Sequence, residues 1–94
     1  MSLDKYLIKE VLKMIRFKSS PVELRGATLK KSKNGNSYVL INIEDENGEH
    51  YQFFSADEYI LQNGFNKGDL VHLVCEFSLY NREVRLSVVE MIKA

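Results

Sequence analysis

The sequence predicts a mainly β fold: a small five-stranded barrel with an extra helix at its N-terminus. Two Asn-Gly pairs, Asn34-Gly35 and Asn47-Gly48, stand between alternating apolar stretches, which is typical of β-hairpin turns. Between them lies Ser37–Glu44, which is rich in β-branched and aromatic residues. Two more alternating stretches follow after residue 69. These observations predict a three-stranded meander extended by a second hairpin, with Asn and Gly at positive φ in tight primed turns.

The remaining elements follow from helical spacing and from breaks in the alternation. Apolar residues recur at helical intervals near the N-terminus, and Pro21 ends that segment. Gly26 interrupts the first strand, which predicts a bulge or sharp bend there. The predicted helices are Leu3–Phe17 and Ala56–Asn63, and the predicted strands are Val22–Lys31, Ser37–Glu44, His50–Ser55, Leu70–Leu79 and Glu83–Ile92.

Beyond the N-terminal helix, the order β-β-β-α-β-β is that of the OB-fold, a partly open five-stranded Greek-key barrel. We therefore expect a single domain over residues 1–94, with an amphipathic helix over 1–18 and the barrel over 22–92. The main alternative is an open five-stranded α+β sheet. The long bent first strand favours the barrel, because such a strand serves both sides of a closed core.

The formal net charge is zero, with 13 cations and 13 anions, but the two signs are segregated. Cations dominate between Arg16 and Lys33, whereas the segment Glu44–Glu58 contains acids and no Lys or Arg. A local basic strip binds polyanions whatever the net charge. The alternative interpretation is two solvated loops of opposite sign.

The lone cysteine, Cys75, has no partner for an intramolecular disulfide, which suits a reducing compartment. No apolar run reaches membrane-spanning length, and the N-terminus has no signal-peptide pattern. We therefore expect a cytoplasmic protein that does not associate with a membrane.

Catalytic and metal-binding patterns are weak. His50 and His72 have no Cys, Asp or His at metal-ligand spacing, and the acids Glu44–Glu46 lack the spacing of a calcium loop. No glycine motif for phosphate is present. The sequence predicts no enzyme, cofactor, metal site or small-molecule substrate.

Tyrosines and cations instead favour binding of nucleic acid. Tyr38 follows a cationic hairpin tip, and Tyr51 begins the third strand. Bases stack on such rings while cations follow the phosphates. Phenylalanines are expected to fill the core, namely Phe53, Phe54, Phe65 and Phe77. The candidate nucleic-acid-binding residues are Arg25, Lys30, Lys31, Lys33, Tyr38, Tyr51, Tyr80 and Arg82.

Short motifs add a family resemblance. The stretch Gly35-Asn36-Ser37-Tyr38-Val39-Leu40 resembles a segment of the filamentous-phage single-stranded DNA-binding proteins, an OB-fold family. Leu70-Val71-His72-Leu73, followed by Phe77 and Arg85-Leu86, is similar in order and spacing, so that the resemblance covers about Val22–Glu90.

That resemblance implies roles for particular residues. Tyr38 and Tyr51 would contact bases, and Arg25 and Lys30 would contact phosphates. The family dimerises through its late hairpin, here Tyr80–Glu83. This chain departs from the family in the helix before Pro21 and in a shorter last turn, which puts dimerisation by that route in question.

We therefore expect a protein that binds single-stranded DNA with little sequence preference, encoded by a phage or another mobile element and forming a homodimer or higher oligomer. RNA is the alternative polymer, since the OB-fold serves both. The alternative of a different class is a protein–protein adaptor that uses the N-terminal helix and the barrel groove.

Overall fold

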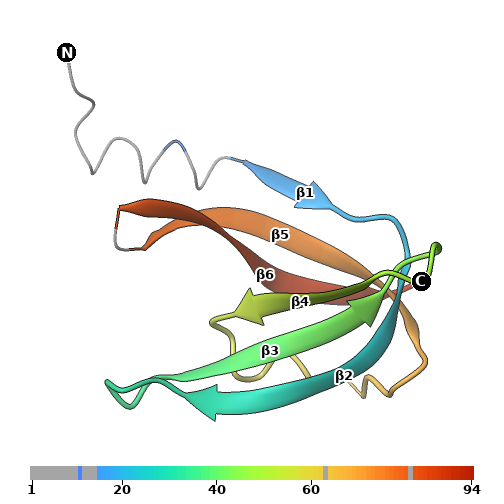
Figure 1. The fold of residues 1–94 in the computed structure, drawn as a ribbon, viewed down its shortest axis with the longest axis horizontal. Coiled ribbons are helices and arrows are strands. Elements are labelled where there is room, and N and C mark those ends of the chain that lie inside the picture. The colour runs from blue at the N-terminus through green and yellow to red at the C-terminus, as the bar shows by residue number, and fades with distance from the viewer. Residues whose placement is uncertain (1–10, 12–14, 63, 81) are drawn as a thin grey trace.

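The computed structural model describes residue 11 and residues 15–62, 64–80 and 82–94. In this part of the chain the backbone forms six strands that curve round one another (Figure 1). Five of them fall where the sequence predicts, three with the predicted bounds and two running one residue further. The strands are β1 (Arg16–Lys18), β2 (Val22–Lys31), β3 (Ser37–Glu44), β4 (His50–Ser55), β5 (Leu70–Tyr80) and β6 (Glu83–Lys93).

The N-terminal part of the prediction needs correction. The C-terminal end of the predicted helix Leu3–Phe17 is strand β1, while residues 1–10 and 12–14 lie outside the described residues. β1 pairs antiparallel with β5, which places Arg16 opposite Glu76 in an ion pair. The Phe17 ring lies 5.9 Å from that of Phe77. Helical spacing in the sequence does not reveal this pairing, because the partner strand lies some 60 residues away.

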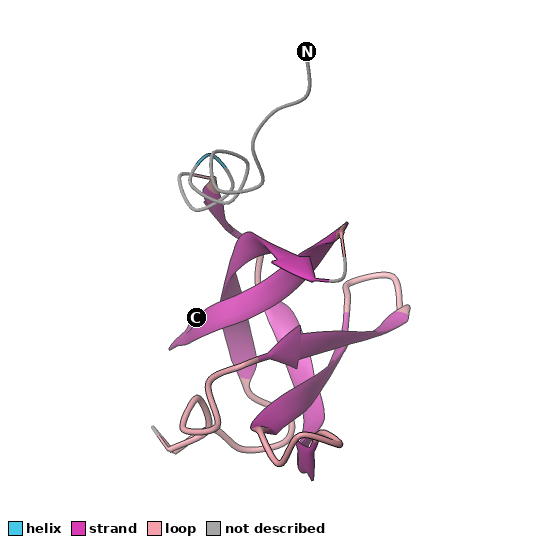
Figure 2. Cartoon of the chain, turned by 90° about the vertical axis from the view of Figure 1, so that its left-hand side faces the viewer, coloured by secondary structure: helices cyan, strands magenta, loops and turns pink. Residues whose placement is uncertain are grey.

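The second predicted helix, Ala56–Asn63, is also wrong over its described residues 56–62, which form turns, and Figure 2 draws no helix between β4 and β5. The Ile60 and Gln62 N–H groups donate to carbonyls three residues back, those of Asp57 and Tyr59, at 3.2 and 3.0 Å. Asp57 Oδ1 also accepts the Tyr59 N–H at 2.9 Å. A short segment nucleates a helix poorly, and such side-chain bonds favour turns. Ile60 is nevertheless buried, so the turns cover part of the core.

Among the described residues, only Val11 has helical backbone, and no run of described residues forms a helix. Accordingly, the described part contains no helix with the length and apolar character to cross a membrane.

The last five strands close into a barrel. β2 pairs with β3 and β3 with β4, both antiparallel; β4 meets β6 in parallel; and β6 pairs with β5, which returns to β2. This is the strand arrangement of an OB-like closed barrel. Alternate residues of the strands fill its interior, and the fully buried ones include Val39, Ile41, Val71, Leu73 and Val88.

β1 and β2 take successive positions along the same edge of β5, joined by Ser19–Pro21. The Ser19 N–H donates to the Leu73 carbonyl at 2.8 Å, and Ser19 Oγ accepts the Leu73 N–H at 2.9 Å. His72 Nδ1 lies 2.9 Å from the Ser19 carbonyl oxygen. The junction between the extra strand and the barrel is therefore held on β5 rather than left as a loose linker.

Both predicted Asn-Gly hairpins are present, but their turns differ from the predicted type. Gly35 and Gly48 have φ of 81° and 78°, and Arg82 is the one described non-glycine residue with positive φ. The N–H of each of these glycines donates to the carbonyl three residues earlier, at 3.0 and 3.1 Å. A turn followed by a single left-handed glycine is the three-residue hairpin with a bulge, so neither asparagine needs positive φ.

The barrel closes between β4 and β6 through very few bonds. One register pair, Phe54 with Ser87, joins the two strands. Beside it, the fully buried Ser55 hydroxyl donates to the Val88 carbonyl at 2.7 Å and accepts the Asp57 N–H at 3.2 Å. One side chain therefore joins both strands and the following turn.

Ser55→Ala is expected to lower the free energy of unfolding by about 1 to 3 kcal/mol, because it leaves a buried carbonyl and an N–H without their partner. Urea denaturation measures the change. Ser78→Ala, at an exposed position of β5, is the matched control and should be close to neutral. Equal stability of both variants would show that Ser55 is not needed for closure.

The predicted irregularity near Gly26 is confirmed as a register shift between Leu24 and Gly26 in the β2–β3 pairing. The glycine itself is not what the bulge requires. Its φ is not positive, and a Cβ built on it meets no atom within 4 Å. The extra residue in the pairing is Arg25.

Gly26→Ala should therefore leave the unfolding free energy unchanged or raise it by a few tenths of a kcal/mol. Gly35→Ala is the contrasting variant: at φ of 81° an added Cβ is expected to cost about 1 to 2 kcal/mol. Thermal or urea unfolding of the pair tests this. A Gly26→Ala loss as large as that of Gly35→Ala would contradict it.

Candidate functional site

The outward surface of β2, β3 and β4 gathers most of the candidate chemistry. Val39, Ile41 and Ile43 of β3 are buried, so the residues between them face outward. Register pairing then aligns outward residues of the neighbouring strands, Leu40 with Phe54 and with Thr28. We call this surface the outer face; its residues are Thr28, Lys30, Tyr38, Leu40, Asn42, Gln52 and Phe54.

Two aromatic rings lie together on the outer face. The Tyr38 and Phe54 centroids are 5.5 Å apart with a 35° interplanar angle, and Phe54 is 38% exposed. Lys30 stands opposite Tyr38 across the β2–β3 pairing and is exposed. The expectation that Phe54 belongs to the core is therefore wrong. The alternation of His50, Gln52 and Phe54 was the signal that could have placed this ring outside.

A polar pair continues the outer face beside the rings. Gln52 Nε2 donates to Asn42 Oδ1 at 3.0 Å across β3 and β4. One amide hydrogen bond holds the two side chains together and does not use the Gln52 oxygen, an acceptor, or the Asn42 NH₂ group, a donor. The outer face thus combines aromatic rings, a cation, and both a hydrogen-bond donor and an acceptor.

Carboxylates surround Arg25 at the far end of the outer face. Its Nη1 lies 3.5 Å from Glu23 Oε1, and its Nε lies 3.8 Å from Glu44 Oε2. His50 Nε2 lies 3.6 Å from the other oxygen of Glu44. These contacts set this predicted phosphate ligand apart from Lys30, because its guanidinium already faces two acids.

The structure does not bring Tyr51 to Tyr38. Tyr51 pairs with Ile43, which points inward, and its ring stacks on that of Phe53 at 6.4 Å. Its ring is 46% exposed at the acidic end of the barrel. The negative charge of Asp45 raises the pKa of Tyr51 above 10.0, with smaller contributions from desolvation and from Glu49. A field that resists formation of phenolate also resists the approach of phosphate.

The other predicted residues lie near the tips of the β2–β3 and β5–β6 hairpins. Lys31 pairs with Ser37 and so alternates to the side of the ribbon opposite Lys30, while the exposed Lys33 is in the turn. Arg82 is exposed in the β5–β6 turn with φ of 65°, and Tyr80 is the last residue of β5. Of the eight predicted residues, Lys30 and Tyr38 are thus neighbours on the outer face. Binding roles for all eight stay predictions.

Other chemistry has little support in the described residues. No group of three or more His, Cys, Asp or Glu side chains in this part of the chain is placed to hold a metal ion. Cys75 is buried, and desolvation raises the pKa of its thiol. A buried, protonated thiol is a poor nucleophile.

No protein-family model and no curated protein matches the chain. Among solved structures, the mitochondrial single-stranded DNA-binding protein Rim1 from S. cerevisiae is similar, with a TM-score of 0.62 and 18% identity. The match covers 84% of this chain and 94% of that chain. At this identity the likeness establishes the fold, a closed mainly β barrel of the OB type. The resemblance to filamentous-phage proteins stays a prediction.

The charge at the acidic end can be tested on Tyr51. Asp45→Asn keeps an Oδ1 to accept the N–H groups of Asn47 and Glu49, each 2.9 Å away, but removes the charge. We expect the pKa of Tyr51 to fall towards its ordinary value. NMR titration of the tyrosine ring resonances measures it.

Glu58→Gln is the matched control. Glu58 raises the pKa of Tyr59 through a hydrogen bond and its charge, so this variant should lower that pKa and leave Tyr51 where it was. If the pKa of Tyr51 were the same in Asp45→Asn as in the wild type, the Asp45 charge would not be what raises it.

Proposed function

We propose that this protein binds single-stranded DNA on the outer face, with little sequence preference. The observation that carries the proposal is the outward-facing Tyr38–Phe54 ring pair, with Tyr38 half-buried and Phe54 exposed, beside Lys30 on an OB-like barrel. The strands that bear this pair are the ones on which OB-folds bind oligonucleotides. The fold that the chain shares with Rim1, a single-stranded DNA-binding protein, supports the same choice of ligand.

Stacking supplies the affinity. Each base that stacks on an aromatic ring contributes about 1 to 3 kcal/mol, and any base has a face that suits. Tyr38 and Phe54, with centroids 5.5 Å apart, offer a combined surface to unpaired bases. A duplex hides its bases in its own stack, so the rings select single strands.

Cations supply the second component. Lys30 stands beside Tyr38, and Lys33 lies at the tip of the same hairpin, so a phosphate backbone that passes over the rings meets both charges. Arg25 joins only where phosphate competes with Glu23 and Glu44. Such binding releases counterions and therefore weakens steeply as salt rises.

The Asn42–Gln52 pair bears on sequence preference. It presents an oxygen and an amide group side by side, and the base edges of single-stranded DNA carry both donors and acceptors. A pair that can bond either a donor or an acceptor on a base edge does not discriminate strongly among bases. Nothing on the outer face is specific for a 2′-hydroxyl, so RNA is the competing ligand in the tests. An origin in a phage or mobile element is part of the proposal.

The first experiment is a titration of labelled oligo-dT at several salt concentrations, followed by anisotropy and by tyrosine quenching. The chain has no Trp to obscure the tyrosine signal. Binding that quenches tyrosine and falls steeply with salt supports the proposal. Absence of binding at low salt would overturn it, and a salt-insensitive oligomer in its place would favour a protein–protein adaptor.

Tyr38→Ala and Phe54→Ala are each expected to weaken binding by about 1 to 3 kcal/mol while the fold is retained, because both rings face outward. Tyr51→Ala is the matched control, a tyrosine on the other side of the sheet, and should change affinity much less. If Tyr51→Ala weakened binding as much as Tyr38→Ala, the strand would follow another path over the barrel.

A further inference from the structure

We infer that a second copy of this chain docks its β2–β3 hairpin tip into a hollow at the opposite end of the barrel, producing head-to-tail rows. The inference deepens and rests on the proposed function, because such rows would carry one DNA strand across several copies. Three observations support it: the lining of the hollow, the composition of the tip, and the positions of the two on one ribbon.

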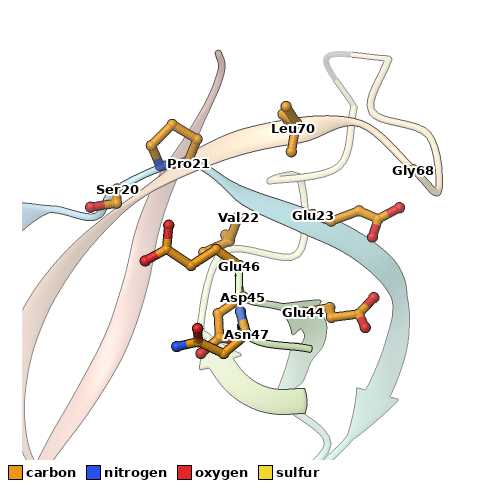
Figure 3. A pocket seen from close by; sticks show the side chains of 10 residues that line it. All are labelled: Ser20, Pro21, Val22, Glu23, Glu44, Asp45, Glu46, Asn47, Gly68 and Leu70. Atoms are coloured by element: carbon orange, nitrogen blue, oxygen red, sulfur yellow. Dashed lines mark hydrogen bonds between the residues drawn. The ribbon is translucent and has the colours of Figure 1, made fainter. Parts of the chain in front are cut away.

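The hollow has a volume of about 470 Å³ and is open to solvent. In Figure 3, Pro21 and Leu70 lie above and the turn Asp45–Asn47 lies below. Leu70 is 57% exposed, a large apolar side chain with little cover. The lining contains no Lys or Arg and four carboxylates: Glu23 and Glu44, which Arg25 contacts from outside the lining, and Asp45 and Glu46. An open hollow of this kind suits a protruding segment that is both cationic and apolar.

The β2–β3 tip has that composition. Leu29 is 60% exposed, and Lys31 is exposed on the same side of β2, because Leu29 pairs with Val39 and Lys31 with Ser37. Lys30 alternates to the other side, with Tyr38. The docking residues and the DNA-binding residues therefore occupy opposite sides of one ribbon, and docking leaves the rings accessible.

The two surfaces lie at opposite ends of the ribbon that β2 and β3 form. Val22 and Glu23, at the start of β2, line the hollow, and Lys31 ends the strand. A contact between unlike surfaces of identical chains is heterologous and does not close on itself unless rotation completes a ring. Successive copies therefore present their outer faces in series. Zero net charge leaves little overall repulsion to oppose this association.

The first test is sedimentation velocity of the full chain without DNA, at low salt and rising protein concentration. The wild type should associate progressively, and salt should reverse this. Glu46→Lys, at an exposed lining residue, and Lys31→Glu, at the tip, should each weaken self-association by about tenfold, since each places like charges together. Glu90→Lys, at an exposed acid on β6, changes the net charge by the same amount as Glu46→Lys and should leave association unchanged.

Mixing sharpens the test. In an equimolar mixture of Lys31→Glu and Glu46→Lys chains, contacts between unlike chains place opposite charges at positions 31 and 46. Association should therefore recover towards the wild-type level. Recovery on mixing is not expected if the variants are misfolded, and Glu90→Lys controls for the change in net charge. A monomeric wild type, or variants that associate as the wild type does, would overturn the inference.

DNA length separates the inference from the proposed function. An oligo-dT of about eight nucleotides spans roughly one OB-fold site, whereas one several times longer admits neighbouring copies. The wild type should bind the longer DNA at least about tenfold more tightly per site. Glu46→Lys should abolish that gain while its affinity for the short DNA matches that of Glu90→Lys. Failure on short DNA refutes the proposed function; equal affinity for both lengths refutes the head-to-tail contact.

Discussion

The fold depends on closing a short sheet into a barrel at the β4–β6 contact. A closed barrel leaves no strand edge exposed, but the closing strands meet here at one register pair. The Ser55 hydroxyl supplies what the backbone does not, a buried 2.7 Å bond to the Val88 carbonyl. Phe54, whose ring lies against that of Tyr38, is the β4 residue of that single pair and the neighbour of Ser55 in the chain. The buried hydroxyl therefore holds to β6 the part of β4 that carries one of the two rings.

Strand alternation decides which side chains are available for binding. One face of β3 fills the core with Val39, Ile41 and Ile43, which leaves Tyr38 and Asn42 on the other face. The turns at the two ends of β3 carry opposite charge. Lysines stand in and before the turn that precedes β3, and acids stand in the turn that follows it. A ligand on the outer face therefore meets positive charge at one end and negative charge at the other.

The sequence predicts the barrel strands well because each has a buried and an exposed side, which a period of two reveals. It misreads residues 15–17 and 56–62, where short segments satisfy a helical pattern while partners distant in sequence or local side-chain bonds decide the structure. Prediction of the site is limited in the same way. Phe54 is assigned to the interior by residue type although its register places it outside, and Tyr51 is grouped with Tyr38 although a register of opposite phase separates them.

The contact between His72 and Ser19 has a consequence for the imidazole itself. Its Nδ1 lies 2.9 Å from a carbonyl oxygen, which only accepts hydrogen bonds, so Nδ1 must carry the hydrogen. The neutral ring is therefore held in the Nδ1–H tautomer, and Nε2 is left as the basic nitrogen. The Ser19 carbonyl thereby decides which ring nitrogen carries the hydrogen, so the junction that holds β1 on β5 also orients the imidazole of His72.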